Sequence, residues 1–309
     1  MTLQLVNVLA DFITVFSNLV KQTCCKVDNR RLRSIVLRIM NIVSNVSHTG
    51  PHRPADIAGF DSHYVLPGDR SRGILLVCDH ARNALPEAYG DLGLPASDFD
   101  RHIAYDIGVE AVVNGLSARL NLPAVLSCFS RLLIDPNRGV NDPTLIMQLS
   151  DGAVVPGNRD LNEAERNFRL SHFYQPYHRA IDAEIDAAIT DGSSPVLISV
   201  HSFTPAWKGL VRPWHAGLLW EDDRRCSDLF IQALSADPNL TVGDNEPYAG
   251  GLAGDCMNIH AVKRGLPHTL VEIRQDLISD DAGVSQWIER LASAIEAMIA
   301  SNQIKDLVQ

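Results

Sequence analysis

The chain has 309 residues, of which 46% are hydrophobic and 21% are charged. These fractions are typical of a globular protein and exclude the collagen-like, disordered and multi-span membrane classes. The 27 Lys and Arg against 37 Asp and Glu give a net charge of −10. Because nucleic-acid binding relies on neutralising phosphates, this charge argues against nucleic acid as a partner.

The first 58 residues differ from the rest of the chain in charge, with seven basic residues against three acidic ones. Residues 3–20 and 30–46 carry apolar residues at helical spacing, which predicts two amphipathic helices. Asp11 interrupts the first apolar stretch and no basic cluster precedes it, so we expect neither a signal peptide nor stable membrane insertion. Residues 1–58 are therefore predicted to be a short helical N-terminal extension. It either packs on itself, is poorly ordered, or meets a membrane surface or a partner.

The six cysteines show no CxxC pair and no regular spacing. This usage favours reduced, mostly buried thiols over a disulfide framework. A reducing cytoplasm is the expected location.

Residues 59–309 are predicted to form one domain, in which short apolar runs alternate with amphipathic stretches. This alternation indicates an α/β fold: a mixed, mostly parallel open sheet flanked by helices. The strands are expected at 73–78, 123–129, 195–200, 216–220, 240–243 and 268–274, and the helices at 106–120, 161–191, 222–235 and 284–301.

Histidines follow two of the predicted strands directly, His80 after the first and His201 after the third. Ligands of an open α/β sheet gather at the carboxyl ends of its strands, so a metal site is one reading of this pair, beside two structural histidines. Glu272 lies between Val271 and Ile273 in the last predicted strand. A buried carboxylate needs a partner or a chemical role, because burying it alone is costly.

Three further stretches carry polar groups. The segment 130–138 holds two arginines and an asparagine, a natural clamp for a carboxylate, although Arg131 could instead form a structural salt bridge with Asp135. The loops at 201–205 and 212–215 have the composition of loops that hold substrates or lids. Their candidate substrate-binding residues are Ser202, Arg212 and His215.

At these residues the chain resembles the N-formylglutamate amidohydrolase family, whose members are similar to zinc carboxypeptidases and aspartoacylases. The resemblance covers about residues 70–300 and is carried by six ordered motifs. They are Asp79-His80-Ala-Arg-Asn83, His102-Ile-Ala-Tyr-Asp106, Ser130-Arg131 with Asp135-Pro-Asn-Arg138, His201-Ser-Phe-Thr-Pro205, Gly243-Asp-Asn-Glu-Pro-Tyr248 and Glu272-Ile-Arg-Gln-Asp276. It implies a zinc-carboxypeptidase-like (phosphorylase/hydrolase-like) fold and a deformylase of histidine degradation.

The resemblance also implies a site with one Zn²⁺ per chain. His80 and His201 match the family's metal-binding histidines, with a carboxylate as third ligand. Asn83 stands where the carboxypeptidase pattern has a Glu, so the acid must come from elsewhere; Asp106 is the first candidate and Asp79 the second.

The remaining roles follow from the same resemblance. Glu272 matches the general base, Arg131 would help to stabilise the oxyanion, and Asn137 with Arg138 match the pair that holds a substrate carboxylate. The expected substrate is a small anionic N-acyl amino acid. Two alternatives stay open: a zinc hydrolase of another N-acyl or peptide-like substrate, and a catalytically silent carboxylate- or metal-binding module.

Overall fold

The computed structural model describes residues 54–300. The helices expected at 3–20 and 30–46 lie outside the described residues. Within residues 54–300 no helix is long and apolar enough to cross a membrane. The four cysteines in this part of the chain, Cys78, Cys128, Cys226 and Cys256, are all free and buried, as expected.

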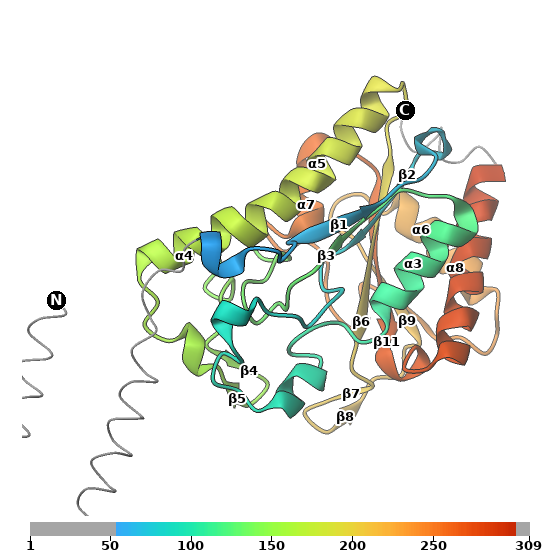
Figure 1. Ribbon diagram of the computed structural model, residues 1–309. Helices are drawn as coiled ribbons and strands as arrows, with labels where there is room; N and C mark the ends of the chain where they lie inside the picture. The colour runs from blue at the N-terminus through green and yellow to red at the C-terminus, as the bar shows by residue number, and fades with distance from the viewer. Residues whose placement is uncertain (1–53, 301–309) are drawn as a thin grey trace, which may run out of the picture. The chain divides into compact units, whose positions relative to one another are not determined.

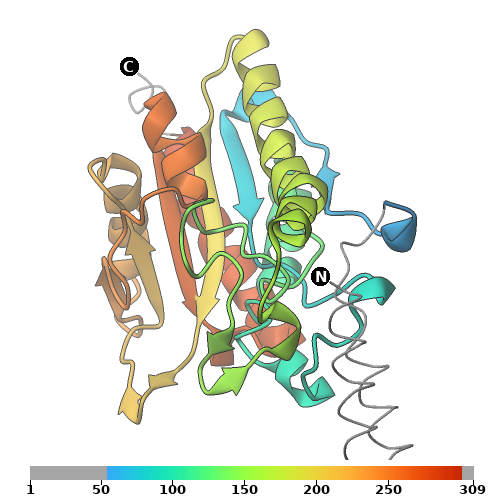
Figure 2. The same cartoon turned by 90° about the vertical axis from the view of Figure 1, so that its left-hand side faces the viewer.

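A seven-stranded sheet forms the centre of the fold, in the order β1-β3-β2-β6-β11-β9-β10 (Figures 1 and 2). Neighbouring strands from β3 to β11 run parallel, β1 is antiparallel to β3, and β9 is antiparallel to β11 but parallel to β10. The strands are β1 (His63–Leu66), β2 (Ile74–Cys78), β3 (Ala124–Ser127), β6 (Val196–Phe203), β9 (Ala216–Leu219), β10 (Val242–Asp244) and β11 (His268–Arg274). This confirms the predicted mixed, mostly parallel sheet.

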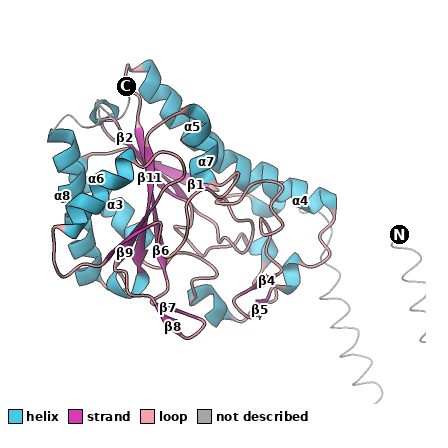
Figure 3. Ribbon diagram, turned by 180° about the vertical axis from the view of Figure 1, so that it is seen from behind, coloured by secondary structure: helices cyan, strands magenta, loops and turns pink. Residues whose placement is uncertain are grey.

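Helices cover both faces of this sheet, as Figure 3 shows from behind. The helices α3, α6 and α8 pack on one face, whereas α5 and α7 pack on the other. The helices are α3 (Val109–Leu120), α4 (Glu163–Arg169), α5 (Gln175–Thr190), α6 (Arg225–Ser235), α7 (Cys256–His260) and α8 (Asp281–Ala300). Two hairpins lie outside the sheet: β4 (Leu149–Ser150) with β5 (Ala153–Val154), and β7 (Ala206–Trp207) with β8 (Leu210–Val211).

The period-2 alternation of the strands divides the core between the two faces. In β2, Ile74, Leu76 and Cys78 belong to the hydrophobic cluster under α3 and α8. The intervening Leu75 and Val77 belong to the cluster under α5. Each core strand is therefore apolar on both sides, which explains the continuous apolar runs in the sequence.

All six predicted strands are present, but some boundaries differ from the prediction. His201 lies inside β6, two residues before its end, and not after the strand as expected. The helix expected at 106–120 begins at Val109, because Gly108 adopts a left-handed conformation (φ 83°). A Cβ at Gly108 would lie 2.2 Å from the carbonyl oxygen of Ile278, so only glycine fits there.

Besides the two hairpins, the sequence does not predict the strand β1 or the helix α7. The edge strand β1 has only four residues and a half-exposed pattern, so it gives little apolar signal. The helix α7 has only five residues. Both are too short for periodicity to reveal.

Candidate metal centre and pocket

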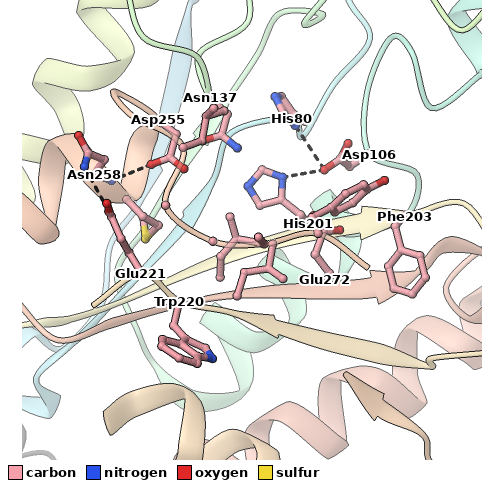
Figure 4. A pocket seen from close by; sticks show the side chains of 18 of the residues that line it. His80, Asp106, Asn137, His201, Phe203, Trp220, Glu221, Asp255, Asn258 and Glu272 are labelled. Atoms are coloured by element: carbon pink, nitrogen blue, oxygen red, sulfur yellow. Dashed lines mark hydrogen bonds and ion pairs between the residues drawn. The ribbon is translucent and has the colours of Figure 1, made fainter. Parts of the chain in front are cut away.

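Two histidines and one aspartate converge on a point beside the carboxyl ends of β2 and β6. The Nδ1 atoms of His80 and His201 lie 3.3 and 2.8 Å from the same oxygen, Oδ2, of Asp106 (Figure 4). All three residues are buried, and one ligand atom from each lies within 4.8 Å of the others. Two imidazoles and one carboxylate are a donor set that Zn²⁺ favours, so these residues fit such an ion.

Each histidine is held from behind by a second carboxylate. The Nε2 atom of His80 lies 2.7 Å from Oδ1 of Asp135, and Nε2 of His201 lies 3.0 Å from Oδ2 of Asp79. Histidine ligands of metals almost always donate their other ring N–H to such a group, which fixes the tautomer and the ring orientation. Both Nδ1 atoms thereby face Asp106.

The same geometry separates the two candidate acids. Asp79 is fully buried behind His201, where it also accepts hydrogen bonds from Tyr177 Oη at 2.8 Å and Ser199 Oγ at 3.2 Å. Asp106 faces both histidines from the opposite side. The structure thus brings Asp106, and not Asp79, into the group with His80 and His201.

The electrostatics of this group favour a bound cation. Burial alone would raise the pKa of Asp106, but the facing His80 and His201 hold it well below its usual range. Burial alone would lower the pKa of His201, yet its contacts with Asp106 and Asp79 raise that pKa well above 6.5. The carboxylates around the two imidazoles therefore stabilise positive charge in a buried place.

Glu272 lies beside this group because β11 pairs in parallel with β6 and the register sets Glu272 opposite His201. Burial and the nearby charge of Asp106 raise the pKa of Glu272 to about 7, against the opposing effect of His201. Its Oε2 atom is buried and receives no hydrogen bond from the described residues. A carboxylate with such a pKa and a free oxygen is suited to moving a proton near neutral pH.

A pocket of about 340 Å³ opens over these residues. Of the predicted substrate-binding residues, Asn137, Arg138 and Ser202 line it, as does Arg131. Arg131 also forms an ion pair with Asp135 (Nη2 to Oδ2, 2.7 Å). The same side chain can therefore form a structural salt bridge and face the pocket.

A model of the N-formylglutamate amidohydrolase family matches residues 72–279. The chain belongs to this family. The match spans the sheet from β2 to β11. It includes Glu272 and the three residues of the candidate metal site, His80, Asp106 and His201, which we call the metal group.

Two solved structures share the fold of this chain. A gene product of Agrobacterium tumefaciens is 32% identical and superposes with a TM-score of 0.73, over 79% of this chain and 97% of that one. The N-formylglutamate amidohydrolase of Ralstonia eutropha is 20% identical, with a TM-score of 0.62 over 78% of this chain and 98% of that one, which shows a shared fold. No curated protein sequence matched the chain.

Two predicted substrate-binding residues do not line the pocket of this family member. Arg212 is buried, and its Nη1 atom donates to Oη of Tyr248 at 2.9 Å; Tyr248 lines the pocket and Arg212 does not. The Nδ1 atom of His215 accepts a hydrogen bond from the Thr241 backbone at 2.9 Å, beside β10. Both side chains therefore form these hydrogen bonds from outside the pocket lining.

Asn83, which departs from the carboxypeptidase pattern, lies outside the metal group. Its Nδ2 atom donates to the backbone oxygen of Phe99 at 2.7 Å. The carboxylate that lies with His80 is instead Asp106, which the β2-to-α3 connection brings back towards that histidine.

Several residues in or behind the pocket are not predicted by the sequence patterns. The sequence indicates Asp135 only as a partner of Arg131, although it also holds His80 from behind the pocket. Glu221, Tyr248 and Asp255 line the pocket from the loops after β9 and β10 and from the start of α7. Loop residues lack periodicity, and only the Asp-x-x-Asn capping pattern at 255–258 gave a local signal.

A second buried cluster, of His178, Cys256 and His260, lies on the α5 and α7 side. Here the histidines bond directly to each other, with Nδ1 of His178 2.7 Å from Nε2 of His260. Asp182 accepts from Nδ1 of His260 at 2.9 Å. Because these nitrogens satisfy each other, the cluster is a hydrogen-bonded link between the two helices.

Proposed function

We propose that the chain is a metal-dependent amidohydrolase that cleaves the amide bond of an N-formyl or other N-acyl amino acid. Membership of the amidohydrolase family supports the reaction type. The observation that carries the proposal is the convergence of His80, Asp106 and His201 next to the unpartnered carboxylate of Glu272, inside one pocket.

His80, Asp106 and His201 would hold one Zn²⁺. When bound, this ion polarises the scissile carbonyl and lowers the pKa of water from 15.7 to about 7. Glu272 takes the proton of the attacking water on its free oxygen and returns it to the departing amine. Its pKa of about 7 allows both transfers near neutral pH.

The arginines of the segment after β3 would orient the substrate. Arg131 is fixed by Asp135, so a donor facing the pocket is available without reorganisation to the developing oxyanion. Arg138 and Asn137 would anchor the substrate carboxylate and so align the amide with Glu272. The products are a free amino acid and formate or another small acid.

The test combines metal analysis with a substrate panel. Purified protein should contain about one zinc per chain and release the amino acid from N-formyl or N-acyl amino acids. Glu272→Gln should keep the metal while losing about 10²–10⁴-fold in kcat, since it removes only the proton carrier. Glu87→Gln, at an exposed position outside the pocket, is the matched control.

His201→Ala should lose both metal and activity. Full metal retention in that variant would remove His201 from the ligand set. Metal binding without turnover of any panel member would favour the silent binding module. Turnover of N-acyl amides as fast as of N-acyl amino acids would reject the role of Arg138 and point to another acyl substrate.

A further inference from the structure

The pocket carries unpaired negative charge at the end remote from Asp106 and Phe203. Figure 4 shows Glu221, Asp255 and Asn258 grouped there, with His201 between them and Asp106. Asp255 is 9% exposed and accepts one hydrogen bond on Oδ1, from the Asn258 backbone at 2.7 Å. Oδ2 of Asp255 has no hydrogen-bond donor among the described residues.

Glu221 likewise has no positively charged partner among the described residues. Its one hydrogen bond within residues 54–300 comes from the neutral Nδ2 of Asn258, at 3.3 Å. Neither Glu221 nor Asp255 forms an ion pair with a Lys or Arg of the described chain. Burial, Asp79 and Glu221 together raise the pKa of Asp255 to about 6, as expected where negative charge is uncompensated.

The positive charges of the pocket come from Arg131 and Arg138. Arg131 is neutralised by Asp135. Arg138 donates to two neutral oxygens, Thr144 Oγ1 and the Asn137 carbonyl, and forms no ion pair with any described acid. Leaving the metal group and Glu272 aside, the described residues that line the pocket therefore include one cation and two carboxylates that form no ion pair.

These opposite charges lie on adjoining segments. The Asn137 side chain accepts from the backbone N–H of Cys256 at 3.1 Å, next to Asp255. The backbones at Gly139 and Gly254 also touch, since a Cβ on Gly254 would lie 2.9 Å from the Cα of Gly139. Even so, Arg138 and Asp255 form no ion pair, so both charges stay available to one ligand.

We propose that Glu221 and Asp255 are specificity-determining residues that select an N-acyl amino acid with a cationic side chain, such as an N-formyl-lysine. The inference rests on the proposed function and refines its substrate from an anion to a zwitterion. The α-carboxylate meets Arg138, and the side-chain ammonium replaces the missing donor at Oδ2 of Asp255. A glutamate side chain would instead add a third carboxylate to this end of the pocket, which like-charge repulsion disfavours.

Calorimetric titration of the zinc-loaded full chain with free L-lysine, L-norleucine and L-glutamate tests this selection without turnover. Norleucine has the shape of lysine without its ammonium. Lysine should bind at least about tenfold more tightly than norleucine, and glutamate most weakly. Equal binding of lysine and norleucine, or tighter binding of glutamate, would overturn the inference.

Two variants test whether Glu221 and Asp255 cause the preference for lysine over norleucine. Glu221→Gln and Asp255→Asn keep the shape of each side chain, and Asn also keeps the capping bond at α7. Each should reduce the lysine-to-norleucine ratio by about tenfold. Asp222→Asn, an exposed neighbour outside the pocket, should leave the ratio unchanged. A ratio that survives in the Glu221→Gln/Asp255→Asn double variant would reject the assignment.

Hydrolysis of the N-formyl derivatives of the same three amino acids separates this inference from the proposed function. Turnover with glutamate preferred would defeat the inference and leave the hydrolase intact. If none of them releases formate but lysine still binds more tightly than norleucine, the proposed function is wrong and the inferred selectivity of the pocket stands.

Discussion

The carboxylate of Asp135 provides the sharpest test of how the metal group is built. It is fully buried and accepts four hydrogen bonds: from His80 Nε2 (2.7 Å), Arg131 Nε (3.1 Å), Arg131 Nη2 (2.7 Å) and the Asn137 backbone (2.9 Å). Asp135→Asn keeps the volume but replaces one acceptor oxygen by an NH₂ group. That group cannot accept from His80 or Arg131, so at least one of the side-chain bonds is lost.

The expected loss follows from the role of Asp135 behind His80. Removing a carboxylate that orients a metal-ligating histidine costs about 10–100-fold in metal affinity, or about 1.4–2.7 kcal/mol. Chelator competition on the purified protein measures this affinity directly. Activity lost at limiting zinc should return when zinc is in excess, because the ligands themselves remain.

Asp182→Asn is the matched control, since Asp182 also accepts from a histidine, His260, but outside the metal group. It should leave the metal affinity unchanged. A zinc affinity of the Asp135→Asn variant within twofold of that of the unaltered protein would refute the reasoning. So would an equal loss in both variants. The melting temperature of each variant separates lost affinity from lost folding.

Three other outcomes are expected. Because the pKa of Asp255 is raised to about 6, the folded state binds more protons than the unfolded state between about pH 4 and 6, and stability falls as pH rises through that window. Urea unfolding should therefore show Asp255→Asn more stable than the unaltered protein by about 1–3 kcal/mol at about pH 8, with no gain at about pH 3. Arg169→Met removes the cation from a buried ion pair with Glu165 (2.9 Å) and should cost about 3–5 kcal/mol in urea unfolding. Arg119→Met, at an exposed pair, should change stability little, and similar costs would contradict this. Arg138→Met should lower kcat/KM about tenfold or more for N-acyl amino acids but not for the corresponding amides, and a uniform loss would reject a carboxylate contact.

Much of the fold was accessible from local patterns. The central strands are buried on both sides, so their apolar runs stand out from the amphipathic helices between them. The polar residues that interrupt or end these runs, His80, His201 and Glu272, were visible for the same reason. Short elements such as β1 and α7 carry too few residues to show a period.

The sequence is enough to identify the candidate residues on the strands, because an ionisable side chain in an apolar strand stands out from its neighbours. How these residues come together depends on the tertiary structure. The choice between Asp106 and Asp79 depends on which carboxylate faces the Nδ1 atoms, and the exclusion of Arg212 on the loop packing around Tyr248. The pairing of β6 with β11 and the return of the chain after β2 set these distances. Both are contacts between residues far apart in the sequence, so no local sequence pattern predicts them.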